Sequence, residues 1–145
     1  MNELSERVVL VIEDNLEHLR QIEAAFEEST IRHRLVTIAN GDEALDFLQR
    51  QGNFADAVRP DLILLDLNLP GRDGREILKE IKNNSQLKRI PIVVLTLSSG
   101  RDDIFNSYAL QGNCYVVKTS DLEQLFQVVK RIEEFWLGIV TLPLE

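Results

Sequence analysis

Five short apolar segments recur along the chain, and each is followed by residues with helical periodicity or a polar turn. The apolar segments are rich in β-branched residues and lack polar alternation, which is typical of strands buried on both faces. We predict strands at 8–12, 35–38, 62–65, 92–95 and 114–117. Because strands and helices alternate, the pattern predicts an all-parallel sheet covered by helices on both faces.

The intervening segments predict five helices. The first is expected over residues 16–28, where Leu16, Leu19, Ile22 and Phe26 recur at helical spacing and Asn15 is a suitable N-cap. The other four are expected through 44–48, through 77–81, at 102–110 and at 121–137, with a polar loop at 51–60. The alternation runs almost to the C-terminus, so we expect a single domain over residues 1–145.

Polar residues stand at the carboxyl ends of four predicted strands. They are Glu13 and Asp14 after the first strand, Asp66 after the third, Thr96 after the fourth and Lys118 after the fifth. In open parallel sheets, ligands bind just beyond these carboxyl ends. The sequence therefore predicts one functional site that these side chains share.

Three carboxylates in one place repel one another, so the predicted site requires a cation. Oxygen ligands without His or Cys favour Mg²⁺. The Lys118 ammonium is the natural partner for a phosphoryl oxygen, and the Thr96 hydroxyl can donate to another. The loop after Asp66 can turn a backbone carbonyl, that of Asn68, toward the metal.

The same residues resemble those of two-component response regulator receiver domains over nearly the whole chain. The resemblance lies in Glu13-Asp14, in Asp66-Leu67-Asn68-Leu69-Pro70 with Asp73-Gly74, in Thr96 and in Lys118. The chain further resembles the small single-domain regulators of phytochrome histidine kinases, of the cyanobacterial type. This resemblance lies in the run from Arg59 to Pro70, in Asp73-Gly74-Arg75-Glu76, in Phe135-Trp136-Leu137 and in Thr141-Leu142-Pro143.

The resemblance implies a flavodoxin-like, doubly wound (βα)5 fold and a stand-alone response regulator rather than an enzyme. Asp66 would accept a phosphoryl group from a sensor histidine kinase, and Thr96 and Lys118 would bind phosphoryl oxygens. Mg²⁺ would be held by Asp14, Asp66 and the Asn68 carbonyl, with Glu13 bound directly or through water. Tyr115 and Thr96 would form the conformational switch.

The sequence departs from that family at one position, because Thr119 follows Lys118 where proline is common. A cis peptide before a residue other than proline costs about 2.5–4 kcal/mol. Either the site stores that strain or the peptide is trans here.

Charge and composition narrow the partners. A formal net charge of −8 argues against nucleic acid, because phosphate backbones are held mainly by Lys and Arg. No apolar run is long enough to span a membrane, and residues 1–7 do not form a secretory signal. The single cysteine, Cys114, is expected to be a buried structural thiol in a reducing, cytoplasmic protein.

Three other functions are weaker interpretations. A haloacid dehalogenase-type phosphatase needs a second aspartate two residues after the nucleophile, where this chain has Asn68. A flavodoxin-like FMN binder needs a phosphate loop that Glu13-Asp14-Asn15 would make repulsive. A phosphorylation-independent interaction module would not need the acidic site.

We expect His18 and His33 to be surface histidines, and Asp102-Asp103 to favour a helix N-terminus.

The last helix carries more apolar residues than one buried face requires, and an apolar tail at 138–145 follows it. We expect this surplus face and the tail to form the interface of a homodimer. The alternative is that the tail folds back over its own domain.

Besides a histidine kinase, a downstream phosphotransfer or effector protein is an expected partner.

Overall fold

Five parallel strands form one sheet in the computed structural model of the chain, which describes residues 6–110 and 112–143. The strand order is β2-β1-β3-β4-β5. The strands are β1 (Arg7–Ile12), β2 (His33–Ile38), β3 (Leu62–Leu65), β4 (Ile92–Thr96) and β5 (Cys114–Val117). The predicted all-parallel, flavodoxin-like fold is therefore confirmed.

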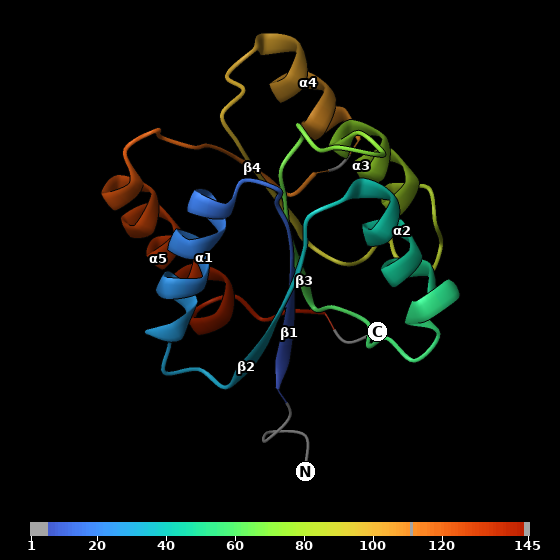
Figure 1. Ribbon diagram of the computed structural model, residues 1–145, viewed down its shortest axis with the longest axis horizontal. Helices are drawn as coiled ribbons and strands as arrows, with labels where there is room; N and C mark the ends of the chain where they lie inside the picture. The colour runs from blue at the N-terminus through green and yellow to red at the C-terminus, as the bar shows by residue number, and fades with distance from the viewer. Residues whose placement is uncertain (1–5, 111, 144–145) are drawn as a thin grey trace.

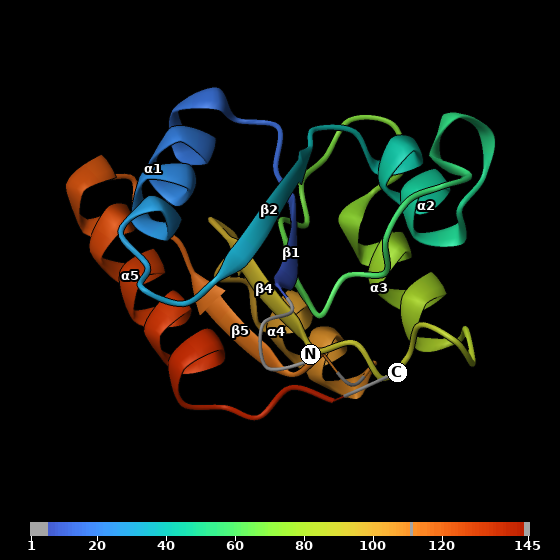
Figure 2. The ribbon, with the colours of Figure 1, turned by 90° about the horizontal axis from the view of Figure 1, so that it is seen from below.

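The helices cover both faces of this sheet. They are α1 (Leu16–Glu27), α2 (Gly41–Gln49), α3 (Gly74–Lys82), α4 (Arg101–Ala109) and α5 (Leu122–Gly138), and a short 3-10 turn, η2 (Gly52–Phe54), lies in the predicted loop. Figure 1 shows α1 and α5 together on one side and α2 and α3 on the other, and Figure 2 shows the same layers from below. Alternate side chains of β1, β3 and β4 fill two separate cores, one under each helical layer.

Side-chain caps at the helix N-termini fix where four of the helices begin. Asn15, Asn40, Asp73 and Asp121 each accept a hydrogen bond from a backbone N–H in the first turn of the helix that follows. These helices all start just beyond the carboxyl end of a strand or its loop. The caps therefore also fix the loops that surround that edge of the sheet.

The buried face of α1 differs from the predicted one in its first turn. Leu16 is 66% exposed, whereas His18, Ile22, Ala25 and Phe26 are buried. His18 lies one helical turn before Ile22, so it shares the buried face. The expectation that His18 is a surface histidine is wrong.

The apolar tail packs against its own sheet. Leu142 is 4% exposed and belongs to the core between the sheet and the α1–α5 layer, and Val140 packs against the same core. The alternative that the tail folds back is thus confirmed for these two residues, and the expectation that they form an intermolecular surface is wrong. Phe135 and Ile139 remain 48% and 73% exposed. The last two residues of the tail lie outside the described residues. So do the first five residues of the chain, on which the expectation that there is no secretory signal partly rests.

Among the described residues, no helix is both long and apolar enough to cross a membrane.

Candidate functional site

The predicted site residues converge at the carboxyl edge of the sheet, at the top of Figure 1. The chain crosses from β2, on one side of β1, to β3 on the other, and ligands of such sheets bind at this change of direction, beyond the ends of β1 and β3. Backbone hydrogen bonds hold the residues that follow the strands: Glu13 N donates to the Ile38 carbonyl at 3.0 Å, and Asp66 N donates to the Ile12 carbonyl at 3.0 Å. On the far side, Lys118 N donates to the Thr96 carbonyl at 2.7 Å.

Lys118 forms the centre of the site. Its ammonium lies 2.6 Å from Glu13 Oε1 and 3.0 Å from Asp66 Oδ2, and all three side chains are buried. Burial of separate charges is costly, whereas a buried ammonium that is hydrogen-bonded to carboxylates is tolerated. The structure therefore joins the predicted cation to two of the predicted carboxylates.

The carboxylates of Glu13, Asp14 and Asp66 also approach one another closely enough to share a metal ion. One oxygen from each lies within 4.8 Å of the others, with Asp14 exposed at the rim. Burial and the nearby Asp66 charge raise the pKa of Glu13 to about 7, against the opposing effect of Lys118. An all-oxygen donor set of this kind fits a hard divalent cation such as Mg²⁺, whose charge would relieve the repulsion.

The loop after Asp66 fixes the direction of its carboxylate. Asn68 N donates to Asp66 Oδ1 at 3.1 Å, so one Asp66 oxygen contacts this loop and the other contacts Lys118. Gly74 begins α3 directly behind the loop, and its N–H donates to the Leu67 carbonyl at 3.0 Å. A Cβ at Gly74 would overlap the Asp66 carbonyl oxygen and the Leu67 backbone, so only glycine fits here.

Thr96 and Tyr115 lie on the β4 and β5 side of the site. Thr96 is fully buried, and its hydroxyl accepts a hydrogen bond from Ser98 N at 3.4 Å. In the described part of the chain, no hydrogen bond joins Thr96 to Asp66. The Tyr115 hydroxyl donates to the Ser98 carbonyl at 2.9 Å, so the Tyr115 ring is tied to the loop that leaves Thr96.

The peptide between Lys118 and Thr119 is trans, as are all the described peptide bonds. Of the two alternatives that Thr119 left open, the structure shows the trans peptide. Lys118 reaches both carboxylates with this geometry.

The part that His18 plays in the site was not predicted from the sequence. His18 Nδ1 lies 2.9 Å from Lys118 Nζ, and the His18 side chain is buried. Its helical spacing four residues before Ile22 was the available signal, because that spacing places it on the buried face of α1. By contrast, His33 is half-buried on β2, where its ring packs against Phe26 at a centroid distance of 5.6 Å.

A second feature that the sequence did not predict is a clamp between α3 and α4. Arg75 donates two hydrogen bonds to Asp103, at 2.6 Å and 2.7 Å, and the Ser98 hydroxyl donates to Asp103 at 2.6 Å. These bonds, with the Arg75 bonds the larger cause, lower the pKa of Asp103 to about 2. Asp103 thus does more than favour the helix N-terminus: it joins α3 to the loop that Tyr115 contacts.

Cys114 is half-buried at the start of β5, and burial raises the pKa of its thiol. A thiol with a raised pKa is less often a reactive thiolate, which agrees with the expected structural role.

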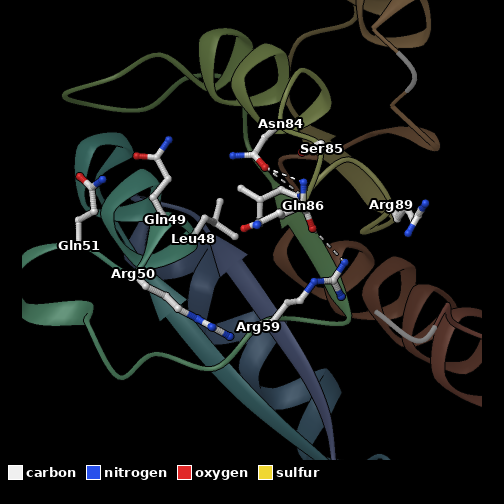
Figure 3. Close-up of a pocket in the computed structure, with 10 residues that line it drawn as sticks. Leu48, Gln49, Arg50, Gln51, Arg59, Asn84, Ser85, Gln86 and Arg89 are labelled. Carbon is white, nitrogen blue, oxygen red and sulfur yellow. Dashed lines mark hydrogen bonds between the residues drawn. The ribbon is translucent and has the colours of Figure 1, made fainter.

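A hollow of about 780 Å³ lies at the opposite, amino edge of the sheet, between the ends of α2 and α3. Its lining includes Arg50, Arg59 and Arg89. Arg59 lies shortly before β3, and Arg89 lies shortly before β4. Figure 3 shows Arg59 between Arg50 and Arg89 and donating to the Gln86 carbonyl. The carboxylates of the candidate site are not part of this lining, so the hollow is separate from it.

The chain is similar to a known protein family and to proteins of known structure. Residues 9–130 match the response regulator receiver domain family. Response regulator Rcp1 of Synechocystis sp. is 50% identical over 137 residues, which cover 94% of this chain and 93% of Rcp1. The crystal structure of Mn²⁺-bound Rcp1 matches with a TM-score of 0.94 and covers 95% of this chain and 99% of its own. The crystal structure of the phosphorylated cyanobacterial phytochrome response regulator RcpA, 53% identical, also has a TM-score of 0.94, with 97% and 100% covered.

Substitution of Gly74 tests how tightly the Asp66 loop is built. We expect Gly74→Ala to lower the free energy of unfolding by roughly 1–3 kcal/mol or more, because the added methyl group meets backbone that cannot move aside cheaply. Gly138→Ala is the control: a Cβ there meets nothing within 4 Å, so the change should be neutral or stabilising by up to about 1 kcal/mol. Denaturant unfolding measures both, and wild-type stability of Gly74→Ala would contradict the packing described here.

Proposed function

This chain belongs to the response regulator receiver family, and we propose that it accepts a phosphoryl group on Asp66 from a sensor histidine kinase in a Mg²⁺-dependent reaction. The observation that carries the proposal is the position of Lys118, whose buried ammonium contacts Asp66 within a cluster of three carboxylates. Such a cluster suits a reaction in which charge must be neutralised while a phosphoryl group arrives.

In the proposed reaction, an Asp66 carboxylate oxygen bonds to phosphorus as the bond from phosphorus to the donor's histidine nitrogen breaks. The histidine nitrogen keeps the electron pair of the broken bond. Lys118 would donate to one phosphoryl oxygen, and the Thr96 hydroxyl would donate to another. Mg²⁺, held by Asp14, Asp66, the Asn68 carbonyl and Glu13, would supply neutralising charge.

The Asp66 carboxylate is held ready for this attack. The Asn68 N–H fixes one carboxylate oxygen and Lys118 fixes the other, so the side chain loses little freedom when the donor binds. This is the extent of the proposed chemistry: the chain would be a phosphorylated regulator and not an enzyme that turns over a separate substrate.

Thr96 and Tyr115 are the proposed switch. A phosphoryl group adds negative charge and strong acceptors beside Thr96, which would move toward it. The loop that contains Ser98 follows Thr96 directly, and its Ser98 carbonyl accepts the hydrogen bond from the Tyr115 hydroxyl. A shift of Thr96 would therefore move the group that holds the Tyr115 ring in place. The phosphorylated site would thereby alter the surface near α4 and β5.

The proposed partners follow from the relatives and from charge. RcpA is described as a phytochrome response regulator, so a kinase of the phytochrome type is the proposed donor. A downstream phosphotransfer or effector protein would read the altered surface. The net charge of −8 favours protein partners over nucleic acid.

We also propose that the chain forms a homodimer, through the exposed apolar part of α5 and the residue that follows it. Phe135 and Ile139 are exposed and four residues apart, so they lie on one side of the chain's last helical turn. Two copies related by a twofold axis could cover both residues at once.

The phosphorylation proposal predicts one phosphoryl adduct on the intact protein after incubation with Mg²⁺ and a small acyl phosphate. Asp66→Asn should remove the adduct, because the amide is a poor nucleophile, and EDTA should prevent it. Asp56→Asn, in an exposed loop, is the matched control and should be labelled like the wild type. Intact-mass spectrometry measures all four samples, and labelling of Asp66→Asn equal to that of the wild type would refute the assignment.

The dimer proposal predicts a dimer in sedimentation velocity of the intact chain. Phe135→Ala with Ile139→Ser should raise the dissociation constant by about tenfold or more, because exposed apolar anchors at a small interface are lost. Gln127→Ala, at an exposed polar position of α5, should not change it. A wild-type chain that stays monomeric at high concentration, with and without phosphorylation, would exclude the interface.

A further inference from the structure

His18 occupies a position in the site that the proposed reaction does not use. It lies in the first turn of α1, where its backbone N–H donates to Asn15 Oδ1 at 3.0 Å. Its side chain is 7% exposed, and Nδ1 lies 2.9 Å from Lys118 Nζ. The cap fixes the start of the helix, and the helix directs the imidazole toward Lys118.

The chemistry of this contact fixes the form of the imidazole. An ammonium has three N–H donors and no acceptor, so His18 Nδ1 must be the unprotonated acceptor. Glu13, Asp66 and His18 together match the three donors of Lys118. Of these three acceptors, His18 is the one that does not belong to the acidic cluster.

We propose that His18 is a positioning residue. It holds the Lys118 ammonium beside Asp66 while the carboxylates of Glu13 and Asp66 give up their hydrogen bonds to Lys118. The inference rests on the proposed phosphorylation, in which Glu13 and Asp66 turn toward the cation and the phosphoryl group. Lys118 then loses its two charged acceptors, and the bond to His18 stays because no step requires that nitrogen. The ammonium is thereby kept at the place where the incoming phosphoryl oxygen needs a donor.

The surroundings favour the neutral imidazole that this role needs. Burial, and then the charge of Lys118, lower the pKa of His18 below its ordinary value of 6.5. Three carboxylates oppose this shift, and the net direction is still downward: Asp66 just after β3, Glu17 in the first turn of α1, and Asp14 between β1 and α1. Protonation at Nδ1 would remove the acceptor and place a second cation against Lys118.

A purely structural role is the competing explanation, because His18 also fills space beside Ile22 on the buried face of α1. His18→Leu keeps an apolar filling and removes the acceptor. His18→Asn is the conservative variant, because its Oδ1 is as many bonds from Cα as Nδ1 of histidine and can accept from Lys118. The two variants therefore separate the hydrogen bond from the packing.

The test is the rate of Asp66 labelling by a small acyl phosphate at saturating Mg²⁺, with thermal unfolding measured for each variant. We expect His18→Leu to slow labelling by about tenfold or more, as for loss of a hydrogen bond to a charged group. His18→Asn should stay within about threefold of the wild type. Wild-type labelling by His18→Leu, or equal slowing in both variants, would overturn the positioning role.

The pH dependence gives a second readout, which does not depend on how well His18→Leu folds. The ratio of wild-type to His18→Asn labelling should fall as the pH drops below 6.5, because histidine can be protonated and asparagine cannot. Because burial lowers the pKa of His18 below 6.5, a ratio that already falls above pH 6.5 would contradict the inference. Absence of Asp66 labelling in the wild type would instead refute the proposed function itself.

A third readout is independent of phosphorylation. Nitrogen-15 NMR of the wild type at neutral pH should show His18 with an unprotonated Nδ1 and a proton on Nε2. A proton on Nδ1 would overturn the inference even if the proposed function holds.

Discussion

The contact between the buried Lys118 ammonium and the carboxylates of Glu13 and Asp66 is the interaction on which the rest of the site depends. Removing one partner of such a buried pair costs about 3–5 kcal/mol, because the other charge is left without compensation. With Asp14 at the rim, three carboxylates share the site with one ammonium, and burial, followed by the nearby Asp66 charge, raises the pKa of Glu13 to about 7. The site is held together while it retains an excess of negative charge that a divalent cation would balance.

This charge arrangement requires the parallel topology. Glu13 and Lys118 are 105 residues apart, and Asp66 and Lys118 are 52 apart, yet each pair is in direct contact. Parallel strands bring their carboxyl ends to one edge, and the strand order reverses direction beside β1, which is where such sheets bind ligands. The caps and Gly74 then fix the loops, so the fold positions each charge with backbone that has little freedom.

Much of this could be read from the sequence, because buried strands and the polar residues that end them are local signals. The strands at 62–65 and 114–117 begin and end as predicted, and Asp66 and Lys118 follow them directly. The convergence of these side chains could be expected once the parallel sheet was inferred, whereas the ion pairs of Lys118 with Glu13 and Asp66 were not predicted. The conformation of the Lys118-Thr119 peptide was left open by the sequence and is trans.

What the sequence did not predict depends on which face a residue occupies. His18 was missed because a histidine is ordinarily taken to be solvent-exposed until its partner is known, and that partner, Lys118, follows β5, far along the chain. The Arg75–Asp103 clamp joins two helices that are separate in sequence, and neither residue has a local pattern that indicates it. The tail was misjudged because an apolar segment beyond α5 can cover its own core or that of a neighbour equally well, and Leu142 is buried in its own.

Chemical mapping of the modified residue tests the central claim most directly. Borohydride reduces an aspartyl phosphate to homoserine with loss of phosphate, so the phosphorylated position becomes a stable residue that peptide sequencing by mass spectrometry can locate. After labelling with acyl phosphate and Mg²⁺, the account predicts homoserine at position 66 and unchanged aspartate at position 14. Homoserine at position 14, or aspartate retained at position 66 in a chain that carries the phosphoryl adduct, would contradict it.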